Sequence, residues 1–96
     1  MIRHIVFLKW KEGTRDHRIE AVEQTPRRMP ETIRHLRRYE LGRDLGMTGS
    51  HDFAVVADFD TAEDYLAYTE DPGHKAVIAE LIAPILESAA RIQYEI

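Results

Sequence analysis

Hydrophobic and polar residues alternate along the first ten residues of the chain, and this period of two predicts a β-strand over residues 2–10. One face of this strand carries His4, Val6, Leu8 and Trp10. The opposite face carries Ile5 and Phe7 between Arg3 and Lys9. Both faces are therefore apolar at the centre, which is typical of a sheet covered on both sides. We assign the His4 face to a layer of helices and expect a second subunit to cover the other.

Three later segments show the same pattern. Residues 36–42 and 53–59 are separated by a loop at 45–50 that contains two glycines, so they predict a β-hairpin. The segment 53–59 is again apolar on both faces. At the end of the chain, residues 91–96 alternate apolar and polar side chains and predict a last strand.

Between the first two strands, the sequence predicts a helix with an early proline stop. Thr14 is a plausible N-cap, and Pro26 should end or kink the helix near Thr25. A further short turn is expected through residues 33–36, after Pro30.

Two more helical segments follow the hairpin. A helix should begin near Thr61, whose hydroxyl can cap it, and end before Pro72, which suits the first turn of the next helix. Pro84 should bend the end of that helix. The resulting order β-α-β-β-α-β predicts an α+β, ferredoxin-like domain over residues 1–96, with a four-stranded antiparallel sheet and helices on one side.

The segment around Pro72 combines a helix break with two residues that can exchange protons. Tyr68 lies in the last turn of one predicted helix and His74 in the first turn of the next. The positive end of a helix disfavours imidazolium, so we expect a neutral His74 that can accept or donate a proton. Alternatively, Tyr68 is a core residue and His74 a solvated or capping residue. His4, on an otherwise apolar face, is either a ligand-contacting residue or a structural histidine bonded to the backbone or to a tyrosine hydroxyl.

Composition narrows the class of protein. A chain of 96 residues with 44% hydrophobic and 31% charged residues fits one globular domain. There is no cysteine, so disulfides, thiolate nucleophiles and cysteine metal sites are excluded. The five histidines show no HExxH-like spacing, and we expect no metal site. The opening residues are too short an apolar run for a signal peptide or membrane span, so a cytoplasmic location is expected.

The formal net charge of −4 argues against a nucleic-acid-binding protein. Positive charge is nevertheless concentrated in the middle of the chain, at Arg27, Arg28, Arg34, Arg37, Arg38 and Arg43. This run either holds an anionic ligand or balances acidic groups at a subunit contact. We favour the second reading, because no aromatic residues are interleaved with the arginines.

Several short motifs together resemble one known family. They are Met1-Ile-Arg-His-Ile-Val, Lys9-Trp-Lys-Glu-Gly-Thr14, Glu40-Leu-Gly-Arg43, Phe59-Asp-Thr61 and the segment from Tyr68 to Asp71-Pro-Gly-His74. The whole chain resembles the stress-responsive dimeric α/β-barrel (Dabb) family. The resemblance implies a homodimer in which two sheets pack face to face into a barrel, in agreement with the strands that are apolar on both faces.

The resemblance also implies several functions. The most informative is that of a polyketide cyclase of the family, which closes a linear polyketide by aldol condensation without metal or cofactor. It implies Tyr68 and His74 as the catalytic pair and His4 as a substrate-contacting histidine. Phe53 and Ile85 replace a further histidine and a tryptophan of that enzyme's pocket, so the ligand implied is small and apolar or polyketide-like, but not identified. The alternatives are a non-catalytic stress-response oligomer and a cofactor-independent monooxygenase.

Overall fold

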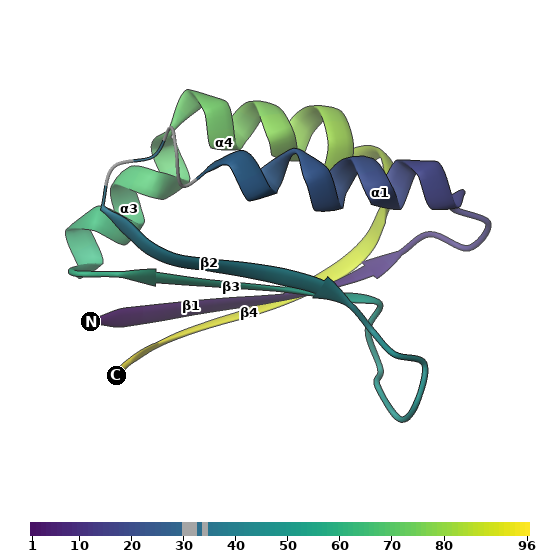
Figure 1. Ribbon diagram of the computed structural model, residues 1–96, viewed down its shortest axis with the longest axis horizontal. Helices are drawn as coiled ribbons and strands as arrows, with labels where there is room; N and C mark the ends of the chain where they lie inside the picture. The colour runs from purple at the N-terminus through teal and green to yellow at the C-terminus, as the bar shows by residue number, and fades with distance from the viewer. Residues whose placement is uncertain (30–32, 34) are drawn as a thin grey trace.

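The fold is a single sheet with its helices on one face. In the computed structural model, residues 1–29, 33 and 35–96 are described (Figure 1). The sheet is antiparallel, and its strands lie in the order β2-β3-β1-β4. The strands are β1 (Ile2–Trp10), β2 (Leu36–Arg43), β3 (Phe53–Phe59) and β4 (Leu86–Glu95). This order confirms the predicted ferredoxin-like arrangement, and it leaves β2 and β4 as the edge strands.

The helices form one layer over this sheet (Figure 1). They are α1 (Asp16–Gln24), α3 (Ala62–Glu70) and α4 (Pro72–Val77), with short 3₁₀ turns at Pro26–Arg28 and Ala83–Ile85 and a π-helical turn at Ile78–Ile82 between α4 and the second of these. Proline lies at the start of both 3₁₀ turns, as expected for a residue that cannot continue a helix. Within the described residues, no helix is long and apolar enough to span a bilayer.

One of the two predicted threonine caps is present. The Thr61 hydroxyl accepts a hydrogen bond of 3.1 Å from the backbone N–H of Asp64, so α3 begins as expected. The prediction for Thr14 was wrong, because its hydroxyl donates to the carbonyl of Lys11 at 2.6 Å and α1 begins only at Asp16. Gly13, with a φ of 82°, turns the chain just before Thr14, and the hydroxyl therefore completes that turn rather than capping a helix.

The last strand is longer than predicted. It begins at Leu86, five positions before the predicted start at Arg91. Residues 86–90 are rich in helix formers, but they pair with β1, where Leu8 lies opposite Ala89 and Trp10 opposite Leu86. Pairing along a complete neighbouring strand outweighs local propensity. The turn expected through 33–36 after Pro30 lies largely outside the described residues.

The core lies between the sheet and the helices. Trp10 is 7% exposed and packs against Phe53 at 5.6 Å between ring centroids, which confirms that the His4 face of β1 is the helix side. A second part of the core contains Phe59, which is fully buried, and Tyr68, which is 4% exposed. Both parts rest on β3, the central strand between β1 and β2.

The opposite face of the sheet is bare in the single chain. Phe7, Ile92 and Tyr94 are 41%, 55% and 42% exposed on it. Arg3 of β1 and Asp58 of β3 form two hydrogen bonds of 2.9 Å on it, and Asp58 is buried. Ile92 and Tyr94 of β4 thus lie on the uncovered side, because Ile92 is registered with Ile5 while Arg91 is registered with Val6.

The basic run is largely neutralised within the chain. Arg37 pairs with Asp60, Arg38 with Glu40, and Arg43 with both Asp16 and Glu23. These three arginines are therefore not arranged as one anion site. Arg27 and Arg28 are exposed on the 3₁₀ turn after α1, and Arg34 lies outside the described residues.

Candidate functional site

A pocket of about 350 Å³ lies between the sheet and the helix layer. We call it the helix-side pocket. Its apolar wall is formed by Val6, Leu8, Met29, Val55, Val77, Ile78, Ile82 and Leu86. Its polar groups are His4, Tyr39, Tyr65, Tyr68, Thr69, His74 and Arg91. All three residues expected to share a pocket, His4, Tyr68 and His74, therefore line the same cavity.

The break between α3 and α4 positions Tyr68 and His74. Asp71 is extended between the helices, and Pro72 starts the second helix. The Asp71 carboxylate accepts a hydrogen bond of 3.0 Å from the backbone N–H of His74, while its own N–H donates to the Tyr68 carbonyl at 3.2 Å. The Tyr68 and His74 rings then stack, with centroids 3.9 Å apart and planes inclined by 31°.

His74 is held in its neutral form by burial. Desolvation lowers the pKa of its imidazole, and the Asp71 carboxylate and the Tyr68 backbone act more weakly in the opposite direction. Burial is thus the largest cause, and it acts in the same direction as the helix terminus that the sequence suggested. The Nδ1 atom is buried, and among the described residues no group meets the distance and angle of a hydrogen bond with it, although the Tyr68 backbone is close enough to act weakly on the pKa of the ring. A buried ring nitrogen without a partner is costly in a purely structural residue, so this atom is a functional candidate.

Tyr68 is a protonated phenol. Burial raises its pKa well above the usual range, and the nearby Tyr39 hydroxyl raises it further. Tyr39 also has a raised pKa because of burial. Both hydroxyls can therefore donate hydrogen bonds at neutral pH, and neither is a candidate for a phenolate base.

His4 forms the floor of the pocket on β1. It is 6% exposed, and its Nδ1 shares a hydrogen bond of 2.8 Å with the Gln93 amide nitrogen. The ring lies 4.9 Å from that of Tyr65 and 6.4 Å from that of Tyr68. Burial lowers the pKa of His4 to about 4, with smaller contributions from Arg91 and His74. Among the described residues, its hydrogen-bond partner is thus a side chain of β4, whereas the sequence suggested the backbone or a tyrosine hydroxyl.

Two residues implied by the resemblance do not line this pocket. Phe53 is 2% exposed and packs against Trp10 at the other end of the core, and Ile85 is 4% exposed in the same cluster. Four polar residues of the pocket were not predicted, namely Tyr39, Tyr65, Thr69 and Arg91. The alternation of β4 carried a signal for Arg91, but the sequence did not show which face of that edge strand meets the helices.

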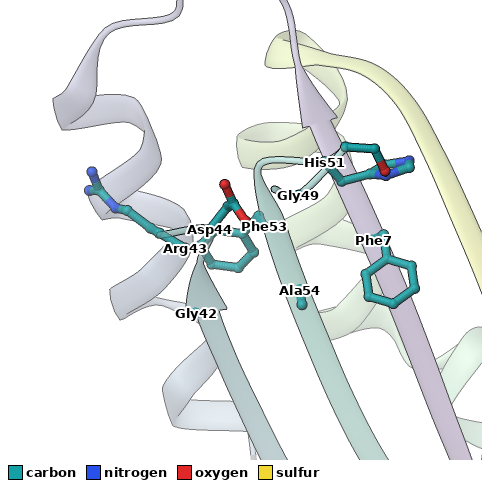
Figure 2. A pocket seen from close by; sticks show the side chains of 9 residues that line it. Phe7, Gly42, Arg43, Asp44, Gly49, His51, Phe53 and Ala54 are labelled. Carbon is teal, nitrogen blue, oxygen red and sulfur yellow. The ribbon is translucent and has the colours of Figure 1, made fainter. Parts of the chain in front are cut away.

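A second pocket, of about 310 Å³, opens on the bare face of the sheet. Its lining side chains come from β1 and the β2–β3 hairpin (Figure 2). Phe7 and Ala54 lie opposite each other on neighbouring strands, and the Phe7 and His51 rings are 5.9 Å apart. This pocket lacks a tyrosine–histidine pair. Across the described residues, no three His, Asp or Glu side chains are grouped as a metal site would require.

The fold and the sequence together define the class of protein. Residues 2–96 match the Dabb family, described as the Stress responsive A/B Barrel Domain, and the chain belongs to this family. No curated protein sequence matches the chain significantly.

Solved structures agree with this assignment. A dimeric ferredoxin-like protein of unknown function from Thermobifida fusca YX is 36% identical, with a TM-score of 0.90, and the match covers 99% of this chain and 90% of that one. A dimeric protein of unknown function from Bacteroides fragilis is 24% identical, with a TM-score of 0.87 and coverage of 99% and 95%. A hydroxynitrile lyase from Passiflora edulis is 21% identical, with a TM-score of 0.84 and coverage of 99% and 92%. The last two show the shared fold alone.

Proposed function

We propose that the helix-side pocket is the acid–base site of a cofactor-independent enzyme that acts on a small carbonyl compound of the polyketide type. One observation carries this proposal: a neutral imidazole with an unpartnered Nδ1 is stacked on a protonated phenol in an apolar pocket. Such a pair supplies a base and a hydrogen-bond donor in a water-poor environment, which is the requirement for removing a proton next to a carbonyl.

His74 is the base in this scheme. It removes a proton from the carbon adjacent to a carbonyl group, and the Tyr68 hydroxyl donates a hydrogen bond to the enolate oxygen that develops. The enolate carbon then attacks a second carbonyl of the same molecule, and the protonated His74 returns the proton to the resulting alkoxide. His4, neutral and at the floor of the pocket, orients the substrate.

Family membership and the fold support this chemistry in general terms. The proposed reaction type is that of olivetolic acid cyclase, the family member that the residues around Tyr68 and His74 resemble. The Passiflora protein, named a hydroxynitrile lyase, has the same fold. The name shows that this fold can carry an enzyme, and the reaction proposed for this chain rests on its own pocket residues.

We also propose that the protein is a homodimer in which two sheets pack through their bare faces. Phe7, Ile92 and Tyr94 would leave a contiguous apolar surface in water in a monomer. The Thermobifida and Bacteroides proteins are both described as dimeric, and the first shares 36% of its residues with this chain. The dimer leaves the helix-side pocket on the outer side of each sheet.

A turnover assay tests the enzymatic proposal. The purified protein is incubated with a panel of β-polyketones and quinols, and each product is followed by mass spectrometry. We expect cyclised polyketone, and a loss of roughly 10²–10⁴ in rate for His74→Ala. His17→Ala is the matched control, because His17 is exposed on α1, outside the pocket. Oxidised quinol instead of cyclised product would favour the monooxygenase alternative, and neither binding nor turnover would favour the non-catalytic oligomer.

A further inference from the structure

The electrostatic character of the helix-side pocket depends on one side chain. Among the described residues that line it, Arg91 is the one with a permanent charge, and no carboxylate lines the pocket. No ion pair joins Arg91 to a carboxylate within the described part of the chain. This contrasts with Arg3, Arg37, Arg38 and Arg43, each of which pairs with an acidic side chain.

The register of the sheet explains why Arg91 faces the pocket. Arg91 lies opposite Val6 of β1, and Val6 is on the same face as His4. β4 is an edge strand, and the Arg91 side chain is exposed as well as pocket-lining, so it lies where the pocket meets solvent. Arg91 also contributes to the low pKa of His4, which places its charge within electrostatic range of the pocket floor.

We propose that Arg91 binds the carboxylate of the pocket's ligand, and that this ligand is a small apolar carboxylic acid. The inference rests on the proposed function, because it assumes that the helix-side pocket binds a small molecule, and it adds the substrate class. The guanidinium presents a planar pair of donors that matches a carboxylate in two parallel hydrogen bonds. The apolar part of the acid would occupy the inner wall, with the carboxylate at the solvent edge.

The size and charge of the site agree with this class. A volume of about 350 Å³ lies at the lower end of the range for small-molecule pockets, roughly 300–1,000 Å³. His4 and His74 are neutral near pH 7, so they do not supply a competing positive charge inside the pocket. Among the described lining residues, one arginine supplies the permanent positive charge. That charge balances a monocarboxylate but not a dianion or a polyphosphate.

Matched pairs of acids and amides test the assignment. The probes are phenylacetate, 3-phenylpropanoate and 4-phenylbutanoate, each with its primary amide, and binding to the full chain is measured by titration calorimetry at pH 7. We expect the best acid to bind roughly tenfold more tightly than its amide, because a charge-assisted hydrogen bond is lost in the amide. In Arg91→Gln this preference should disappear while the affinity for the amide is retained. Arg91→Lys should keep part of the preference for the acid, because an ammonium group retains the positive charge but lacks the planar pair of donors of a guanidinium.

Two controls separate local from general effects. Arg15→Gln makes the same change in net charge at an exposed position outside the helix-side pocket, and it should leave the preference intact. Added salt should weaken the binding of the acid but not that of the amide, because salt screens the interaction of Arg91 with a charged ligand alone.

The outcomes distinguish this inference from the proposed function. Equal affinity of the wild-type protein for acid and amide, or a preference that survives in Arg91→Gln, would overturn the role of Arg91 while leaving the pocket as a binding site. Failure of every acid and amide to bind a wild-type protein that still cyclises a β-polyketone would overturn the carboxylic acid class alone, and failure of both assays would overturn the proposed function as well. The wild-type comparison needs no variant, so it decides the question even if Arg91→Gln does not fold.

Discussion

The imidazole of His74 lies against the phenol ring of Tyr68, with 3.9 Å between centroids and an angle of 31° between planes. The contact is therefore between ring faces. The Tyr68 hydroxyl instead interacts with that of Tyr39. The ring of Tyr68 thus covers the His74 imidazole, while its hydroxyl is the group proposed to donate a hydrogen bond to a ligand. Substitutions can separate these two roles.

Replacing Tyr68 with Phe removes the hydroxyl and keeps the stack. We expect the pKa of His74 to be unchanged in Tyr68→Phe, and turnover to fall roughly 10²–10³-fold, as when one donor to a developing oxyanion is removed. In Tyr68→Leu the ring contact is lost as well, and the pKa of His74 should move back toward its usual value as the imidazole becomes hydrated. NMR titration of the His74 ring protons and steady-state kinetics measure the two effects. Full activity in Tyr68→Phe would show that the hydroxyl does not stabilise the enolate.

Stability should fall in mild acid because of His4. Its pKa is lowered from 6.5 to about 4, so the unfolded chain binds a proton at a pH where the folded one does not. The stabilisation from a neutral His4 is therefore complete above pH 6.5 and is lost as the pH falls from 6.5 to about 4, by at most about 3 kcal/mol. Urea denaturation across this range measures it.

The matched comparison for this prediction is His4→Gln. Carboxylates titrate in the wild-type protein and in the variant alike, so the difference in their unfolding free energies isolates His4. The unfolding free energy of the wild-type protein should exceed that of His4→Gln by more at pH 7 than at pH 4. A difference that stays constant with pH would contradict the assigned pKa shift.

Much of the fold could be predicted because local signals agreed with tertiary structure. Phe53–Phe59 is the predicted return strand, and Thr61 and Pro72 are the predicted helix starts. The signals failed where distant contacts decide the conformation. Residues 86–90 have helical propensity but complete the pairing of β4 with β1, and Thr14 is engaged by the turn at Gly13.

The candidate site was predictable only in part, for a related reason. The helix break placed Tyr68 near His74 because both lie within one short segment. The alternation of side chains along β1 assigned His4 to the face that meets the helices. Arg91 depends on which side of an edge strand meets the helices, and its apolar neighbour Ile92 points to the bare face. The alternation of residues 91–96 does not by itself show which of its two sets of side chains meets the helices, because the apolar set lies on the bare face.

Charge on the bare face should dissociate the dimer. Phe7 is at the centre of that face and 41% exposed in the single chain. In Phe7→Glu, a carboxylate would be buried between the two sheets without a partner, so we expect sedimentation at micromolar concentration to show monomers where the wild-type protein shows dimers. Leu66→Glu is the control, because Leu66 is 59% exposed on α3 in the helix layer. A dimer that persists in Phe7→Glu would place the subunit contact elsewhere.

Asp71 links the helix cap to the chemistry of His74. Its carboxylate accepts the His74 backbone N–H at 3.0 Å, and its charge raises the pKa of the His74 ring, against the larger effect of burial. Asp71→Asn keeps an oxygen that can cap the helix and removes the charge, so the pKa of His74 should fall further with little loss of stability. Asp71→Ala removes both, and should cost in addition about 0.5–2 kcal/mol of unfolding free energy.

Thr61→Ala is the matched control, since it deletes the cap of α3 without removing a charge near His74. It should lower stability by a similar amount and leave the pKa of His74 unchanged. If His74 is the general base, the acidic limb of the pH–rate profile reports its pKa, and this limb should move to lower pH in Asp71→Asn but not in Thr61→Ala. A limb that stays in place while the NMR-measured pKa of His74 falls would mean that another group accepts the proton.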